Sequence, residues 1–347
     1  MRYTGTPSLP ALRAIPSTPW WKRPPLSPKT TIGVFVFILA GQMHRVRIQG
    51  PRPCSIPMNQ RSSDSQVERN GPANPDAVPA AQQHVTAHFD SDAPYWDGVY
   101  RGEDLQGRIY QQRQAVVLDN VLAADLPDGA SVLEIGCGAG HLTEALAGRG
   151  LHVDAVDVSQ AMVDATAERI GQAGLAGQVT VAIADAHALP FESSRFELVV
   201  AVGVIPWLHS PGDSLREMAR VLRPGGQLIL TADNRARLSS FIDPRAMLAL
   251  ITPLRRAWRA LPRRTPRPLA TNRLDFPRRI DELLVGANLR PLGRRTVGFG
   301  PFSFLGRPLF GERRGVLIDD RLQALADRGV PGLRWTGWHY VVRARKL

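Results

Sequence analysis

A short apolar segment that runs directly into a glycine-rich turn is the feature that most restricts the fold of this chain. Residues Ser131–Ile135 read as a buried strand, and Gly136-Cys137-Gly138-Ala139-Gly140 follow without an intervening loop. A helical pattern begins at once with His141. Glycines at a strand-to-helix turn let a ligand approach bare backbone. The segment therefore predicts a ligand at the carboxyl end of a strand in an α/β sheet.

The spacing of these glycines excludes one common class of ligand. A dinucleotide fingerprint needs its third glycine at position 141, which here is His141. The turn instead follows an acidic residue, Glu134. With no pyrophosphate to hold, this carboxylate can orient a positively charged amino group, directly or through water. A tight turn that binds nothing is the alternative.

Apolar runs alternate with helical periods from His84 onward, as in a doubly wound sheet. The expected strands are Ser131–Ile135, Leu151–Val156, Gln178–Ala184, Phe196–Val202, Gln227–Thr231, Arg294–Phe299 and Gly337–Arg345. The expected helices are His141–Arg149, Gln160–Ala173, Gly212–Leu222 and Arg278–Ala287. We therefore expect a Rossmann-like α/β fold with a seven-stranded, mostly parallel sheet and helices on both faces.

Two further acids follow strands in register with the glycine turn. Asp157 closes the second strand, where a carboxylate can accept both hydroxyl hydrogens of a ribose. Asp185-Ala186 closes the third strand, where a carboxylate can accept from the exocyclic amine of an adenine. Each acid alone is typical of a solvated loop. Together with the glycine turn they favour a nucleoside site.

The successive motifs resemble those of class I S-adenosylmethionine-dependent methyltransferases, in the type 11 group related to ubiquinone and menaquinone biosynthesis. The matching segments are Val132–Gly140, Asp157-Val158-Ser159, Asp185–Phe191 and Val221–Gly226. The segment from Phe89-Asp90-Ser91 to Tyr95-Trp96-Asp97 is similar to the N-terminal cap of small-molecule O-methyltransferases.

This resemblance implies S-adenosyl-L-methionine as the cofactor, with Glu134 near the methionine amine, Asp157 on the ribose, and Asp185 with Ala186 at the adenine. It also places Arg113 near the cofactor carboxylate. The cofactor-binding residues expected from the resemblance are Arg113, Glu134, Gly136, Cys137, Gly138, Gly140, Asp157, Val158, Ser159, Met162, Asp185, Ala186 and Val202.

Methyl transfer to a hydroxyl needs a base, and histidine suits neutral pH. We predict His209 for this role, because its loop follows the fourth strand, where acceptors lie in this fold. A solvated bystander is the alternative, and His187 is the second choice. Trp207 is either a wall of an apolar acceptor pocket or an ordinary core contact. Cys137 reads as a packing residue, and we assign no metal site.

Charge divides the chain into three parts. Residues 1–83 carry 10 Lys and Arg against 3 Asp and Glu, residues 84–234 carry 9 against 20, and residues 235–347 carry 24 against 8. The first part is rich in Pro and Ser, so we expect a disordered extension over 1–83 and a methyltransferase domain over 84–347. Translation starting at Met43 or Met58 is also open.

We expect a cytoplasmic enzyme, because only Cys54 and Cys137 are present and export would separate the enzyme from its cofactor. The apolar run 32–40 is too short to span a bilayer.

The basic last third suggests what the acceptor is. Within a basic insert over 235–276, Met247–Leu261 can form a helix with an apolar stripe and an arginine edge, suited to an anionic membrane or to a lid over the pocket. In the C-terminal part, 278–347, the aromatic run Phe299–Phe310 reads as a loop that shapes a hydrophobic acceptor site. Both features favour O-methylation of a small lipophilic acceptor, such as a lipid or isoprenoid.

Two other functions stay open. A nucleic-acid methyltransferase would use the arginines as phosphate contacts, although Val204-Ile205-Pro206-Trp207 lacks the Asn/Asp-Pro-Pro-aromatic signature of many base-modifying relatives. A scaffold that binds the cofactor or a membrane without turnover is the non-enzymatic alternative.

Overall fold

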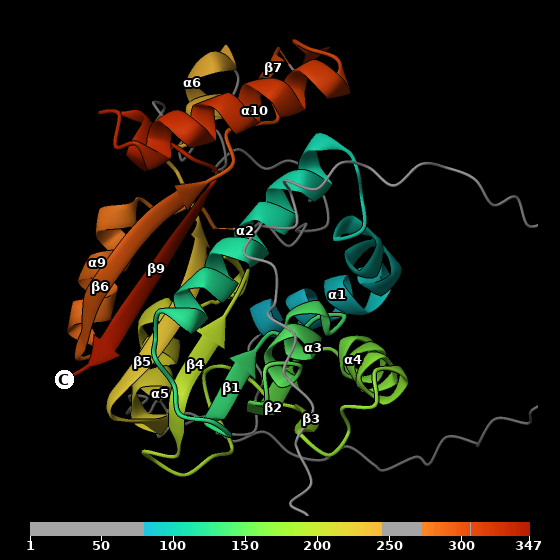
Figure 1. Ribbon diagram of the computed structural model, residues 1–347, viewed down its shortest axis with the longest axis vertical. Helices are drawn as coiled ribbons and strands as arrows, with labels where there is room; N and C mark the ends of the chain where they lie inside the picture. Colours follow the sequence, from blue (N-terminus) through green and yellow to red (C-terminus); the bar gives the residue numbers. More distant parts are fainter. Residues whose placement is uncertain (1–79, 245–272, 306) are drawn as a thin grey trace, which may run out of the picture. The chain divides into compact units, whose positions relative to one another are not determined.

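The computed structural model describes residues 80–244, 273–305 and 307–347 (Figure 1). The helices are α1 (Ala80–Val99), α2 (Leu105–Leu122), α3 (His141–Ala147), α4 (Gln160–Gln172), α5 (Pro211–Val221), α6 (Leu238–Ile242), α9 (Pro277–Gly286) and α10 (Glu312–Asp327), with short 3-10 turns η2 (Ile205–Trp207) and η3 (Leu333–Trp335). The strands are β1 (Ser131–Ile135), β2 (His152–Asp157), β3 (Val179–Ile183), β4 (Phe196–Ala201), β5 (Leu222–Asp233), β6 (Leu289–Val297), β7 (Ser303–Phe304), β8 (Arg307–Pro308) and β9 (His339–Lys346).

The main sheet confirms the predicted architecture. Its seven strands follow the order β3-β2-β1-β4-β5-β9-β6, and only β9 runs antiparallel to its neighbours. The chain crosses from β1 to β2 on one side and later returns to place β4 on the other side of β1. In open α/β sheets the ligand binds beyond the carboxyl ends of the strands where the order reverses in this way. The glycine turn follows β1, at that position.

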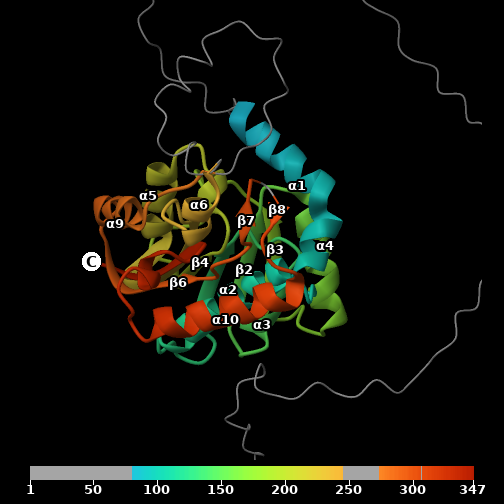
Figure 2. The same ribbon diagram turned by 90° about the horizontal axis from the view of Figure 1, so that it is seen from above.

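Both faces of the sheet are covered, so its central strands are apolar on both sides. In β4, Val199 and Ala201 pack into a core completed by α5 and α9, whereas Leu198 and Val200 pack into a second core completed by α2 and α3. Figure 2 shows α5 and α9 on one side of the sheet and α2 and α3 on the other. These two cores fix the strand ends that carry the candidate site.

Several boundaries differ from the predictions. The strand expected over Gln227–Thr231 begins at Leu222, because Phe196 pairs with Leu222 across a register shift. The strand expected over Arg294–Phe299 spans Leu289–Val297. Helix α1 already begins at Ala80, within the extension predicted to be disordered. The remainder of that extension and the predicted helix Met247–Leu261 lie outside the described residues.

Several elements near the carboxyl edge had no counterpart among the predicted helices and strands: α1, α2, α6, the hairpin β7–β8, and α10. Helix α10 packs on α2, and the hairpin contacts α6. None of the described helices combines the length and the apolar character needed to cross a lipid bilayer.

Candidate active site

The glycine turn leaves an open backbone surface above β1. The amide groups of Gly136 and Cys137 donate hydrogen bonds to the carbonyl of Val156, at 2.7 and 3.1 Å, which fixes the turn to β2. Gly136 has φ of 71°, and a Cβ there would lie 2.5 Å from a methyl group of Val204. A Cβ on Gly138 would meet nothing within 4 Å. The turn therefore needs glycine at position 136 and faces empty space at position 138.

The turn lies at the base of a cavity of about 460 Å³, within the range of small-molecule sites. All the predicted cofactor residues line this cavity except Gly140 and Ser159. Gly140 instead packs against Thr166, and Ser159 caps helix α4 by accepting from the amide of Met162. The structure thus brings the three strand-end acids and Arg113 into one space.

Asp157 is held in place by the backbone of the two turns beside it. One carboxylate oxygen accepts from the amide of Gly138 at 3.0 Å, and the other from the amide of Ser159 at 3.1 Å. A carboxylate has about four lone-pair sites, so acceptor capacity remains for a ligand in the cavity. Burial raises the pKa of Asp157, while these amide bonds act in the opposite direction.

Glu134 is almost completely buried at the foot of the cavity. Its carboxyl group accepts a hydrogen bond from the hydroxyl of Thr143 at 2.6 Å. Burial raises the pKa of Glu134 to about 8, although the Thr143 bond lowers it. No described cation forms an ion pair with Glu134. A ligand that brings a positive charge would therefore favour ionisation of this group.

Arg113 supplies the opposite charge in the same cavity. No described carboxylate lies within ion-pair distance of its guanidinium. The guanidinium donates a hydrogen bond to the hydroxyl of Tyr100 at 2.6 Å and lies 4.5 Å from the ring centre of Tyr110. Its Nε is buried without a hydrogen-bond partner in the described structure. Buried arginine is normally paired. The cavity therefore fits a ligand with a carboxylate and a cationic group, as S-adenosylmethionine has.

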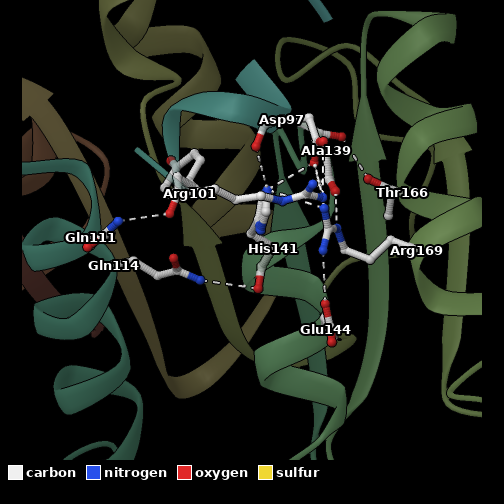
Figure 3. A network of polar contacts seen from close by, with 11 residues as sticks. Asp97, Arg101, Gln111, Gln114, Ala139, His141, Glu144, Thr166 and Arg169 are labelled. Carbon is white, nitrogen blue, oxygen red and sulfur yellow. Dashed lines mark hydrogen bonds and ion pairs between the residues drawn. The ribbon is translucent and has the colours of Figure 1, made fainter. Parts of the chain in front are cut away.

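A polar network attaches α1 to the glycine turn (Figure 3). Arg169 on α4 donates to Asp97 of α1 at 2.6 Å and to the carbonyl of Ala139 at 2.6 Å, and it pairs with Glu144 at 3.3 Å. A second attachment is the hydroxyl of Ser159, which donates to Asp90 of α1 at 2.5 Å. Helix α1 is therefore fixed over the cavity by groups from the ligand-binding turns themselves.

Aromatic side chains form the outer wall of the cavity. The ring of Trp207 lies 5.3 Å from His88 and 5.1 Å from Phe89, both on α1, and Phe89 lies 5.7 Å from Trp96. The aromatic lining residues are His88, Phe89, Tyr95, Trp96, Tyr100, Tyr110, His141, Trp207 and Trp338. Trp207 lines the cavity, and its role as a wall of an acceptor pocket stays a prediction. The wall suits a flat apolar molecule.

The predicted base His209 is exposed and is not among the described residues that line the cavity. Its ring stacks on that of His187, with centroids 3.7 Å apart. His187 in turn contacts the Asp185 carboxylate through Nδ1 at 2.7 Å. Burial and the neighbouring His187 lower the pKa of His209. The role of His209 stays a prediction.

Asp233 and Trp338 are cavity residues that the sequence prediction missed. Asp233 ends β5, and its carboxylate lies 3.1 Å from Nδ1 of buried His339. The two residues meet because β9 inserts beside β5 in antiparallel register. A strand-final acid after Gln227–Thr231 was the available local signal for Asp233. No local signal identifies Trp338. None of the described residues of the predicted acceptor loop Phe299–Phe310 lines the cavity.

No group of three or more His, Cys, Asp or Glu side chains in the described ranges is arranged to hold a metal ion.

Comparison with known proteins agrees with this geometry. Residues 133–230 match the family model described as a methyltransferase domain. The chain is 37% identical over 146 residues to a demethylmenaquinone methyltransferase of Thermobifida fusca, covering 42% of this chain and 59% of that protein. It is 28% identical over 194 residues to a ubiquinone biosynthesis O-methyltransferase of Cereibacter sphaeroides, covering 56% and 74%.

The methyltransferase GfsG of Streptomyces halstedii is 35% identical over 107 residues, which cover 30% of this chain and 38% of that protein. The chain thus spans less than two thirds of the length of this relative and of the Thermobifida relative. Among solved structures, the [4+2]-cyclase SpnF matches with a TM-score of 0.52 at 20% identity, covering 78% of this chain and 97% of that chain. This likeness supports the fold.

Proposed function

Since residues 133–230 form a class I S-adenosylmethionine-dependent methyltransferase domain, we propose that the whole chain O-methylates a small, lipophilic acceptor. The observation that carries the proposal is that one cavity contains the glycine turn, Glu134, Asp157, Asp185 and Arg113, which has no ion-pair partner among the described residues, beneath an aromatic wall.

In this proposal the chain's residues bind the two ends of the cofactor and exclude water. Arg113 holds the carboxylate, Glu134 orients the amine, Asp157 accepts from the ribose hydroxyls, and Asp185 with Ala186 faces the adenine. When bound, S-adenosylmethionine supplies an electrophilic methyl group on a positively charged sulfur. Alignment and desolvation can account for much of the rate of such a transfer, so few reactive side chains are needed.

The acceptor is proposed from the wall that faces the cofactor residues. Trp207, Phe89 and Trp96 present aromatic rings to the cavity, and the relatives named for demethylmenaquinone and ubiquinone biosynthesis point to the same class of compound. Peripheral contact with an anionic membrane fits an acceptor of this kind, in an enzyme otherwise proposed to be cytoplasmic.

A hydroxyl acceptor must lose its proton, and two groups are candidates to receive it. His209 is the base predicted from the sequence. Asp233 has the more direct placement, because its carboxylate lines the cavity and is braced by His339. We propose Asp233 as the alternative base to His209.

Calorimetry with S-adenosylmethionine tests the site. Asp157→Ala removes charge-assisted hydrogen bonds worth about 1.5–3 kcal/mol, so affinity should fall roughly 10- to 150-fold. Asp154→Ala is the matched control, because Asp154 lies on the same strand but pairs with Arg195 on the surface at 2.6 Å. Equal affinity of wild type and Asp157→Ala would reject the site assignment.

Labelling a cell extract with methyl-labelled cofactor tests the acceptor class. Label in an organic-soluble fraction is the expected result. Label in RNA would favour the nucleic-acid methyltransferase, and binding of cofactor without any transfer would favour the scaffold.

A further inference from the structure

We propose that the hairpin β7–β8 and the first turns of α10 form a docking surface for an anionic lipid bilayer. This inference rests on the proposed function, because a docked bilayer would give a lipophilic acceptor a route to the site. We define the docking surface as Phe304, Leu305, Arg307, Leu309, Phe310, Arg313 and Arg314. It differs from the predicted helix Met247–Leu261, which lies outside the described residues.

The apolar part of the docking surface is exposed although nearby residues are well packed. Phe304, Leu305, Leu309 and Phe310 are 46%, 49%, 45% and 42% exposed. Phe302, two residues before Phe304, is 6% exposed and belongs to a small core with Phe299 and Ala326. Four large apolar side chains within seven residues therefore remain more than two fifths exposed beside the available core. Contiguous exposed apolar groups commonly mark a site of interaction with a protein or membrane.

The hairpin is fixed in this position. The amide of Leu309 donates to the carbonyl of Phe302 at 3.0 Å, and the hydroxyl of Ser303 donates to Asp243 at 3.1 Å. Phe310 also packs edge-on against Phe302, with ring centroids 6.0 Å apart. The exposed rings are thus held outward by a packed base.

Charge beside these rings identifies the partner as anionic. The four acids of α10 are engaged toward the domain: Glu312 accepts from the amide of Leu105 and Asp319 from the amide of Phe299. Asp320 accepts from Gln112, and Asp327 pairs with Arg295. By contrast, Arg307, Arg313 and Arg314 are exposed and form no ion pair within the described chain. Exposed apolar groups next to unpaired arginines complement the acyl boundary and headgroups of an anionic bilayer.

The topology places the docking surface at the same sheet edge as the cavity. Val297 at the carboxyl end of β6 and Asp233 at the carboxyl end of β5 both lie opposite His339 of β9. The hairpin follows β6, and α6, which follows β5, contacts β7 (Figures 1 and 2). Asp233 itself lines the cavity. A bilayer at the hairpin would therefore lie on the side where the acceptor enters.

Co-sedimentation of the full chain with phosphatidylcholine vesicles, with and without 30% phosphatidylglycerol as a roughly physiological anionic fraction, tests the proposal. The double variant Arg313→Gln with Arg314→Gln should bind anionic vesicles about 25-fold more weakly, because each arginine near the surface contributes about fivefold in affinity. Leu309→Ser with Phe310→Ser should weaken it at least about tenfold. The matched control is Arg278→Gln with Arg279→Gln, the equivalent exposed arginine pair in the first turn of α9.

Hydrogen exchange on the unmodified chain keeps the test independent of any variant's folding. Anionic vesicles should slow exchange over residues 303–316 and leave α9 unchanged. Three results would overturn the proposal. The chain could fail to bind anionic vesicles, or the α9 arginine variant could weaken vesicle binding as much as the α10 variant does. The α10 arginine variant could also lose binding to single-stranded RNA while its binding to vesicles is unchanged. Cofactor calorimetry is a separate measurement, so failure of the docking surface and failure of the proposed function give different results.

Discussion

Glu134 is a carboxyl group whose charge depends on what occupies the cavity. Its pKa of about 8 follows from burial and leaves it largely protonated at neutral pH. A bound ammonium or sulfonium favours the ionised form, so binding near pH 7 should release a proton. Affinity for S-adenosylmethionine should therefore rise with pH, by up to about tenfold per unit below pH 8.

Calorimetry in buffers of different ionisation enthalpy measures this proton release. The isosteric Glu134→Gln variant cannot ionise, so its binding should show less proton release and a flatter pH dependence. If wild type and Glu134→Gln release the same number of protons, Glu134 does not respond to the ligand's charge.

The two candidate bases also differ at the residue scale. We expect Asp233→Asn to lower methyl transfer by at least about 100-fold, and His209→Gln by less than about tenfold, because general-base catalysis requires contact with the acceptor. The organic-soluble extract fraction serves as acceptor, and unchanged cofactor affinity is the control. The opposite order would support His209, and its lowered pKa then predicts loss of rate only below about pH 6.5.

Helix α1 depends on its polar attachments at the scale of elements. Arg169→Ala removes hydrogen bonds to Asp97 and to Ala139, so we expect a loss of about 1–3 kcal/mol in the free energy of unfolding and weaker cofactor binding. Hydrogen exchange over residues 85–97 should accelerate. Arg149→Ala is the control, because the exposed Arg149 side chain, just after α3, donates to the carbonyl of Ala145 in that helix and does not reach α1. Unchanged exchange in α1 would contradict this account.

Elements with strong local patterns were predictable, and those made by long-range pairing were not. The apolar run Ser131–Ile135 followed by glycines fixed β1 to the residue, and the acids Asp157 and Asp185 lie at the cavity because parallel strands share one carboxyl edge. Helix α2 was missed because Gln and Arg interrupt its apolar stripe, LQGRIYQQRQAVVLDNVL. The Asp233–His339 contact joins residues 106 positions apart, so no local pattern encodes it.

At the scale of the whole molecule, the cavity draws on one part of the chain. Among the residues that the structure describes, those lining the cavity fall between Gln82 and Trp338, and those forming the two cores of the sheet come after position 100. We therefore expect deletion of residues 1–79 to change the cofactor dissociation constant by less than about twofold, a small effect of the size expected away from a site. Calorimetry on the shortened and full chains checks this. A larger loss would assign a binding role to the extension.

Strand β9 lies between β5 and β6 although it follows both in the chain. During synthesis, β5 and β6 therefore each keep an unpaired edge where β9 will later bind. Neither strand gains β9 as its neighbour until the ribosome has passed position 346. The Asp233 wall of the cavity forms in that same closing event, because His339 arrives with β9. A nascent chain arrested before β9 would already contain the glycine turn and the turns with Asp157 and Asp185, and yet lack the finished Asp233 side of the cavity.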